Sequence, residues 1–218
     1  MLRILAGMHN EKSIKMKTHA IRIHQFGGPD VLRFEQVNLP EPAAGEARIR
    51  HKAIGLNFID TYFRTGLYPS TLPAGLGSEA AGIVEAVGPG VNVVKVGDRV
   101  AYTGRPADAF SEARNFPANQ LVPIPPKISD EQAAAVLLKG LTAWYLLRRS
   151  YPVKKGDTVL LYAAAGGVGS LASQWAKSLG VTVIGVVSTA EKAKLARAQG
   201  CEHIVMADDP DVPAAVRK

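Results

Sequence analysis

The stretch from residue 158 to residue 179 constrains the fold more than any other part of the sequence. Thr158-Val-Leu-Leu-Tyr162 is a continuous apolar run of strand length, of the kind found in parallel strands that are buried on both faces. The turn Ala163-Ala-Ala-Gly-Gly-Val-Gly169 follows, and then Leu171, Trp175 and Leu179 recur at helical spacing before Gly180. A glycine-rich turn between a buried strand and a helix is the diphosphate-binding element of doubly wound nucleotide-binding folds.

The chemistry of this turn depends on its backbone. Gly166 lets the chain approach a diphosphate closely, Gly169 lets the helix pack against the strand, and the first turn of a helix offers unpaired N–H groups to an anion. The predicted cofactor-binding residues here are Gly166, Gly167, Val168 and Gly169. A turn that only allows helix and sheet to pack is the alternative.

The pattern continues beyond the first helix. Residues 181–187 form a second buried apolar run, residues 191–199 a second helix that ends at Gly200, and residues 203–206 a third strand. The order β-α-β-α-β predicts the first half of a Rossmann domain.

A different pattern precedes residue 129. Short alternating segments are separated by Gly and Pro, which predicts an all-β barrel or sandwich with one short helix over 57–64. The predicted strands cover 19–24, 31–37, 47–54, 82–87 and 98–102. Ser129 and Gln132 then form a capping-box pattern that starts a helix to about residue 150, with a break expected at Gly140. The fold class is therefore α/β, with a β domain before a doubly wound one.

Composition and charge exclude several classes of protein. The chain is 47% hydrophobic and 21% charged, and its longest apolar run is far shorter than the ~20 residues of a membrane span. The apolar stretch at the start of the sequence is too short for a secretory signal, so a cytoplasmic protein is expected.

Cys201 is the single cysteine, which excludes an intramolecular disulfide and a Cys-rich zinc site. The net charge is +7, but the basic residues are scattered, which favours a solvated surface over a nucleic-acid site.

The end of the second strand selects the form of the cofactor. NAD sites usually place a carboxylate there for the ribose 2′-hydroxyl, whereas this chain has Ser188 and Thr189, with Lys192 one helical turn later. Hydroxyls and a cation suit a 2′-phosphate, so NADPH is the predicted cofactor. Two alternatives stay open: a plain N-cap with a solvated lysine, and Glu191 turned toward a ribose.

Taken together, several stretches resemble the zinc-free quinone oxidoreductase branch of the medium-chain dehydrogenase/reductase superfamily, which includes zeta-crystallin. The resemblance extends from about residue 18 to residue 205, with matching segments at 27–32, 52–62, 66–69, 75–82, 96–100, 138–142 and 163–169. It implies a GroES-like catalytic domain, a Rossmann domain, NADPH, and reduction of a small-molecule quinone. It also implies a homodimer for the full-length protein.

The zinc-binding relatives place a cysteine near residues 57–60 and a His-Glu pair in the later loop. This sequence has no cysteine before Cys201 and reads Gly77-Ser78-Glu79 in that loop, so no metal site is predicted. Glu79 is expected to be a buried structural carboxylate, with Arg99 as a candidate partner.

The segment from Asn57 to Tyr62 holds the candidate catalytic residues. On a helix, Asn57 and Thr61 share one face, and Phe58 and Tyr62 share the neighbouring face. The resemblance places this segment beside the nicotinamide, where Asn57 and Asp60 would orient cofactor or substrate and Tyr62 and Tyr68 would line a quinone pocket. The further cofactor-binding residues that it implies are Phe58, Thr142 and Tyr145. An N-cap asparagine, a surface aspartate and core tyrosines are the alternatives.

The sequence also departs from the family. It ends at Lys218, where full-length relatives continue by about a hundred residues, so it resembles a truncated member. For such a member we expect an unpaired sheet edge, weak NADPH binding and poor or no turnover. Met206-Ala207-Asp208 stands where the family often carries a tyrosine near the adenine. The expected domains are an extension over 1–15, a GroES-like domain over 16–138 and a partial Rossmann domain over 139–218. An enoyl or alkenal reductase, and a non-enzymatic crystallin-like or RNA-binding relative, are the alternative functions.

Overall fold

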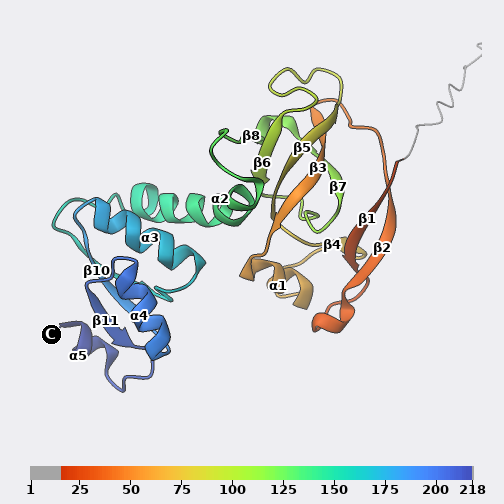
Figure 1. The fold of residues 1–218 in the computed structure, drawn as a ribbon. Coiled ribbons are helices and arrows are strands. Elements are labelled where there is room, and N and C mark those ends of the chain that lie inside the picture. Colours follow the sequence, from red (N-terminus) through yellow and green to blue (C-terminus); the bar gives the residue numbers. More distant parts are fainter. Residues whose placement is uncertain (1–15, 218) are drawn as a thin grey trace, which may run out of the picture. The chain divides into compact units, whose positions relative to one another are not determined.

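The computed structural model describes residues 16–217, which form two compact units that divide between Ala135 and Val136 (Figure 1). The extension expected over residues 1–15 lies outside the described residues, and the predicted domain limits at 138 and 139 stay predictions.

The first unit is built from antiparallel strands. The chain forms a three-stranded sheet in the order β2-β1-β4 and a five-stranded sheet in the order β7-β3-β5-β6-β8. The strands are β1 (Met16–Ile23), β2 (Arg33–Leu39), β3 (Glu46–Gly55), β4 (Ala74–Gly75), β5 (Glu79–Val87), β6 (Arg99–Thr103), β7 (Ala113–Pro117) and β8 (Val122–Pro123). The one α-helix between the strands is α1 (Phe58–Thr65), and short 3₁₀ turns cover Pro29–Val31 and Ala118–Gln120. All five predicted strands and the predicted helix are present, and residue 31 belongs to the 3₁₀ turn before β2.

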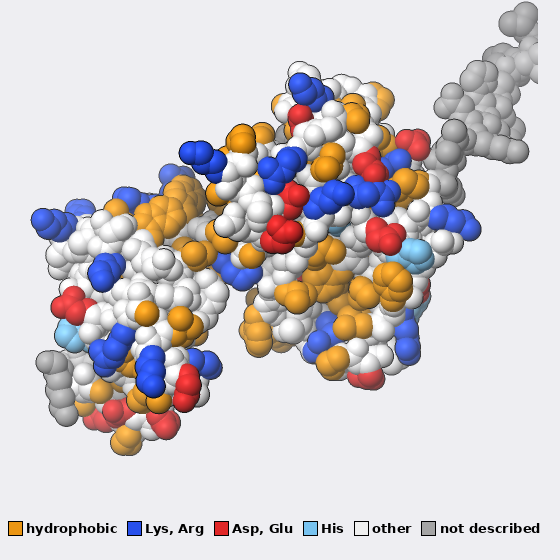
Figure 2. All heavy atoms as spheres, viewed as in Figure 1, with side chains coloured by type: hydrophobic (Ala, Val, Ile, Leu, Met, Phe, Trp, Pro, Cys, Tyr) orange, Lys and Arg blue, Asp and Glu red, His pale blue; other side chains and the backbone are white. Residues whose placement is uncertain are grey.

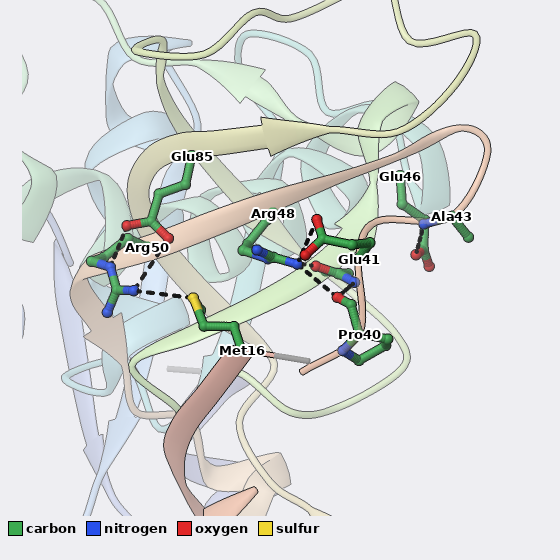
Figure 3. Close-up of polar contacts among 9 residues, drawn as sticks. Met16, Pro40, Glu41, Ala43, Glu46, Arg48, Arg50 and Glu85 are labelled. Atoms are coloured by element: carbon green, nitrogen blue, oxygen red, sulfur yellow. Dashed lines mark hydrogen bonds and ion pairs between the residues drawn. The ribbon is translucent and has the colours of Figure 1, made fainter. Parts of the chain in front are cut away.

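Strand β3 lies between β7 and β5 in the larger sheet, with apolar side chains on one face and charged side chains on the other. Ile49 is fully buried in the core with Val84, Tyr102 and Phe116. On the other face, Arg50 pairs with Glu85 on the neighbouring strand β5, and its guanidinium also lies 3.8 Å from the sulfur of Met16 (Figure 3).

Arg48, two residues earlier on β3, is buried in spite of its charge. Its guanidinium lies 3.3 Å from the carboxylate of Glu41 and donates a 2.8 Å hydrogen bond to the carbonyl oxygen of Pro40 (Figure 3). A buried cation requires such partners, because desolvation without them is costly. These contacts hold the segment before β3 against the sheet.

Helix α2 (Asp130–Tyr145) begins where the sequence predicts. The hydroxyl of Ser129 accepts the N–H of Gln132 at 3.1 Å, and the amide oxygen of Gln132 accepts the N–H of Ser129 at 2.9 Å. The break expected at Gly140 is wrong, because the helix continues through it and ends in a π-helical turn over Leu146–Ser150. A glycine inside a helix costs only about 1 kcal/mol, which the surrounding helix formers outweigh.

The second unit is a parallel sheet with helices between its strands. Its elements are β9 (Thr158–Tyr162), α3 (Gly167–Ser178), β10 (Thr182–Val187), α4 (Ala190–Ala198), β11 (His203–Met206) and α5 (Val212–Arg217). The sheet order is β11-β10-β9 with both pairs parallel, as the β-α-β-α-β pattern predicts. Helices α3 and α4 pack on this sheet through buried alanines, valines and the thiol of Cys201.

Burial of β9 on both faces, which the apolar run predicted, is wrong. Val159 and Leu161 pack into the core, whereas Leu160 is 44% exposed and Tyr162 is 62% exposed. Alternate side chains of a strand project to opposite faces. Among residues 16–217, β9 lies at an edge of its sheet, and the helices cover only the face that carries Val159 and Leu161. None of the helices in this described range is long and apolar enough to cross a membrane.

Candidate functional site

Helix α1 begins at a buried carboxylate. Asn57 has an extended backbone and precedes the first helical residue, and its N–H donates to Oδ2 of Asp60 at 3.0 Å. The other carboxylate oxygen of Asp60 accepts a 2.9 Å hydrogen bond from the hydroxyl of Ser78. Asp60 is buried, so the alternative of a surface acid does not hold. These bonds hold the orientation of the first turn of α1.

The aromatic side chains of this segment form a connected group. Phe58 and Tyr62 meet edge to face with ring centroids 5.4 Å apart, and Tyr62 meets Tyr68 at 5.3 Å. Tyr68 also meets Phe63, and the guanidinium of Arg105 lies 4.4 Å from the centroid of Phe63. Phe58 and Tyr68 remain exposed, so this group presents aromatic surface for a flat apolar ligand.

A cavity of about 380 Å³ is lined by Asn57 and Thr61, which share a face of α1 as predicted, and also by Phe58 of the aromatic group. Its lining also includes Leu56 and Phe110, which it shares with a wider apolar groove of about 700 Å³ along β3. Tyr62 and Tyr68, which were expected to line a substrate pocket, are not part of either lining.

Glu79 is fully buried, as predicted, and sits close to the start of this segment. A Cβ atom on Gly55 would lie 2.7 Å from a carboxylate oxygen of Glu79, so the glycine permits this close approach. Arg99 forms its ion pair with Asp130, at 2.8 Å, and not with Glu79. Glu79 and Arg99 lie on the paired strands β5 and β6, but the side chain of Arg99 extends toward Asp130 at the start of α2.

In the second unit, the glycine turn joins β9 to α3 without side-chain capping. Gly166 is the residue before the helix, with an extended backbone, and its N–H donates to the carbonyl of Ala163 at 2.8 Å. Because no side chain caps α3, its first N–H groups stay available to a ligand. A Cβ on Gly169 would lie 2.4 Å from the carbonyl oxygen of Ala163, so only glycine allows this helix position.

Ala163 has a left-handed backbone conformation, with φ of 50°, which is unusual for a residue with a side chain. Ala164 is fully buried, and its methyl group lies close to Gly185 of β10. Strained backbone of this kind is common at ligand-binding turns.

The second strand-to-helix junction, from β10 to α4, is capped by side chains. The hydroxyl of Thr189 accepts the N–H of Lys192 at 3.2 Å, which confirms the N-cap alternative for this residue. The ammonium of Lys192 donates to the hydroxyl of Ser188 at 3.0 Å. The side chains of Ser188, Thr189 and Lys192 are exposed. Because β9 and β10 pair in parallel, this junction and the glycine turn both lie at the carboxyl ends of the strands.

The remaining candidates of this unit lie on α2. Thr142 donates its hydroxyl to the carbonyl of Leu138 at 2.8 Å, and Tyr145 is exposed at the end of the helix. Sequence reasoning missed Lys139, one turn before Thr142, whose side chain lies over Gly167. It also missed Ser78 as the partner of Asp60. No local sequence pattern marks Lys139 or Ser78, because each contacts a segment that is distant in the sequence.

Charged and metal-ligating side chains do not gather in one cluster on the described residues. On the face shown in Figure 2, Lys and Arg side chains of the β unit alternate with Asp and Glu side chains. Within the part of the chain that the structure describes, no three His, Cys, Asp or Glu side chains are grouped so that they could hold a metal ion.

Comparison with known proteins gives matches for both units. Residues 43–126 match the family described as Alcohol dehydrogenase GroES-like domain, and residues 167–218 match the family described as Zinc-binding dehydrogenase. A Pseudomonas aeruginosa quinone oxidoreductase is 56% identical over 83% of this chain and 56% of its own length. A Burkholderia 2-haloacrylate reductase is 45% identical over 90% of the chain and 61% of its own length.

Solved structures agree with these matches. The crystal structure of Escherichia coli quinone oxidoreductase complexed with NADPH superposes with a TM-score of 0.87 at 48% identity, over 89% of this chain and 60% of that one. The two family models thus place a GroES-like β domain before a dehydrogenase domain, and this chain is similar to quinone oxidoreductases over most of its own length. The chain spans somewhat less than two thirds of the length of the relatives that it matches.

Proposed function

We propose that the protein to which this chain belongs is an NADPH-dependent quinone reductase. The observation that carries the proposal is the pair of strand-to-helix junctions at the carboxyl ends of β9 and β10. One junction is an uncapped glycine turn suited to a diphosphate, and the other presents Ser188 and Lys192, which suit a 2′-phosphate. The Escherichia coli relative, whose structure is described as a complex with NADPH, supports the same cofactor.

NADPH, when bound, supplies the hydride, so the side chains need only bind and orient the reactants. The residues Gly166, Gly167, Val168 and Gly169 hold the diphosphate through backbone N–H groups, and Ser188, Thr189 and Lys192 hold the phosphate of the ribose. Thr142 and Tyr145 contribute to the nicotinamide-ribose region. Asn57, Phe58 and Asp60 orient the nicotinamide, and Tyr62 and Tyr68 offer aromatic surface to the quinone.

Reduction without zinc is part of the proposal. Ser78 and Glu79 stand in the loop where zinc-binding relatives carry their His-Glu pair, and the carboxylate of Asp60 is already held by Ser78 and by the start of α1. Carbonyl polarisation is then left to hydrogen-bond donors such as the amide of Asn57 and the phenols of the tyrosines.

The test is oxidation of NADPH by a small quinone such as 1,4-benzoquinone, followed by stopped-flow absorbance with and without a metal chelator. We expect turnover that the chelator leaves unchanged. Isothermal titration with NADPH, run on the same chain, separates binding from turnover. Turnover that is lost with the chelator contradicts the zinc-free mechanism, and the absence of NADPH binding contradicts the cofactor assignment.

A second candidate is reduction of an activated alkene other than a quinone, which the similarity to the Burkholderia 2-haloacrylate reductase favours. Both reactions deliver a hydride to a conjugated system from the same cofactor. A panel that compares quinones with 2-haloacrylates and enals at equal concentration decides between the two activities by their kcat/KM ratio.

A cytoplasmic location and a homodimeric assembly are also proposed. The single, buried cysteine suits a reducing compartment without requiring one. The homodimer rests on the family resemblance alone, and sedimentation of the protein would test it.

A further inference from the structure

The start of α1 is capped in a different way from the other α-helices of the described residues. The caps of α2 and α4 are neutral and exposed, formed by Ser129 with Gln132 and by the hydroxyl of Thr189. At α5, an exposed carboxylate oxygen of Asp211 accepts a backbone N–H, and no side chain caps α3. At α1, the capping group is the carboxylate of Asp60, which is only 5% exposed.

The burial of Asp60 is costly, and a helix cap does not require it. A carboxylate at the third position of a helix caps the first turn equally well when it is exposed, whereas a buried one must be paired to offset its lost hydration. The second partner of Asp60 comes from outside the helix, because the hydroxyl of Ser78 donates to its Oδ1 atom at 2.9 Å. A buried charge therefore connects the start of α1 to a separate loop.

Ser78 has a fixed position in that loop. Its carbonyl oxygen accepts the hydroxyl of Thr103 at 3.0 Å and the N–H of Gly104 at 2.9 Å, at the end of β6. The carbonyl of the preceding residue, Gly77, accepts the N–H of Asp108 at 3.0 Å. The Ser78 hydroxyl is thus held relative to the β sheet before it reaches α1.

The hydrogen bonds from Ser78 to Asp60 and from Asn57 to Asp60 lead to the cavity of about 380 Å³, which Asn57 lines. Helix α1 has only eight residues, and a helix of that length is too short to be stable without contacts from the rest of the fold. The place of Asn57 at the start of α1 therefore depends on where Asp60 is held. Since each oxygen of Asp60 accepts a hydrogen bond, loss of one partner changes the position that the carboxylate offers to the other.

We infer that Ser78 is a positioning residue for the proposed quinone site: through Asp60 it sets the place of Asn57, whose amide donates to a quinone carbonyl. The inference rests on the proposed function, because that function assigns the carbonyl to Asn57. Ser78 does not belong to the lining of the cavity and has no direct contact with the substrate. Its effect on the substrate should therefore require the side chain of Asn57.

The experiment is an NMR titration of the isotope-labelled full chain with duroquinone, a fully substituted quinone that has no free ring position for alkylation. The variants are Ser78→Ala, Asn57→Ala and the double variant. We expect Ser78→Ala to raise the Kd of duroquinone about fivefold, as the loss of one hydrogen bond to the ligand implies. In the Asn57→Ala background the same change should leave the Kd unaltered, because the side chain through which Ser78 acts is absent.

Three further variants complete the experiment. Ser111→Ala is the matched control, because Ser111 is also a buried serine of the first unit, and its hydroxyl donates to the carbonyl of Asp108 at 2.9 Å. It should leave the Kd unchanged. Ser78→Thr keeps the hydroxyl and should keep most of the affinity. If the amide spectrum shows that Ser78→Ala is unfolded, Ser78→Cys takes its place, since a thiol keeps the volume and is a weak donor.

The outcomes separate the inference from the proposed function. If the unmodified chain does not bind duroquinone, the proposed quinone reduction fails and the inference fails with it. If the unmodified chain binds duroquinone and Ser78→Ala binds it equally well, only the inference is overturned. Equal losses from Ser78→Ala with and without the Asn57 side chain would also overturn it, because a general loosening of the fold acts in both backgrounds. A loss of the same size in Ser111→Ala or in Ser78→Thr has the same meaning.

Discussion

In the unit that ends at Ala135, the interior holds charged and hydrogen-bonding side chains, whereas the described part of the unit that starts at Val136 buries almost none. Arg48, Asp60, Glu79 and Arg114 are all buried in the first unit. In the second, Ser173 is the buried polar side chain, and it lies 3.3 Å from the sulfur of Cys201. The first unit therefore depends on specific polar partners, and the second depends on apolar packing and backbone turns.

The difference has a physical origin in the two kinds of sheet. Helices α3 and α4 cover one face of the parallel sheet with small apolar side chains, and its polar chemistry lies at the ends of the strands. In the antiparallel unit, loops connect the strands. The backbone N–H and C=O groups of these loops are not paired within a sheet, so side chains must pair with those that are buried. Arg114, for example, donates to the carbonyl of Pro106 at 2.9 Å. Polar truncation and protonation should therefore affect the first unit more than the second.

The largest expected effect comes from His51. Its Nδ1 atom lies 2.6 Å from the carbonyl of Ser111 and its Nε2 atom lies 2.8 Å from the hydroxyl of Tyr102, so a neutral ring donates to one and accepts from the other. Burial lowers the pKa of His51 from 6.5 to about 4. The unfolded chain then binds a proton at higher pH than the folded chain does. The neutral, buried His51 therefore contributes its full stabilisation above pH 6.5. As the pH falls from 6.5 to 4, the free energy of unfolding decreases by about 3 kcal/mol.

Hydrogen exchange measured by mass spectrometry at several pH values resolves the two units and checks this expectation, after correction for the intrinsic exchange rate. Peptides from β3 and β6 should lose protection between pH 6.5 and 5, and peptides from β9 and β10 should not. His51→Gln should remove the pH dependence, and His203→Gln, at an exposed histidine of the second unit, should not alter it. Equal pH dependence in both units would break the comparison.

A smaller effect is expected from Ser78→Ala. The Ser78 hydroxyl donates to the buried carboxylate of Asp60, and loss of a hydrogen bond to a charged group should cost about 2 kcal/mol in the free energy of unfolding. Urea unfolding followed by hydrogen exchange in peptides of α1 and β5 measures this value in the first unit. Ser178→Ala is the control in the second unit, because that exposed hydroxyl donates only to a backbone carbonyl. A loss at Ser178 as large as the loss at Ser78 would show that the units do not differ in this respect.

The smallest expected effect concerns the cap of α4. Thr189→Ala removes the side chain that accepts the N–H of Lys192, and it should destabilise α4 by about 1 kcal/mol. Increased hydrogen exchange confined to α4 is the measurement, and Thr189→Ser should restore protection. Loss of protection throughout the unit would mean that its stability rests on polar contacts after all, contrary to the comparison.

The elements of both units could be predicted from local patterns. The capping box at Ser129 and Gln132 formed as expected, and the strands and helices from residue 158 to residue 206 lie within one or two residues of their predicted limits. These patterns work because caps, turns and periodicity are properties of neighbouring residues. The helix break at Gly140 failed because one glycine weakens a helix without ending it.

Properties that depend on distant partners could not be predicted in this way. An apolar run does not say whether both faces of its strand are covered, and Leu160 and Tyr162 of β9 are exposed. The partners of Asp60 and Arg99 lie 18 and 31 residues away in the sequence. The side chain of Lys139, which lies over Gly167 of the glycine turn, was missed for the same reason. The assignment of Asn57, Tyr62 and Tyr68 to catalysis rests on the family resemblance and stays a prediction.

The buried thiol of Cys201 makes the second unit suitable for a chemical measurement. Cys201 is the single cysteine of the chain and is buried behind Ser173 among the alanines of α3 and α4. An alkylating reagent can reach it only when this core opens, so the alkylation rate reports that opening and nothing in the first unit. Addition of a nucleotide that binds the closed form should slow the reaction in proportion to its saturation. The chain therefore carries its own probe for ligand binding, without any introduced label.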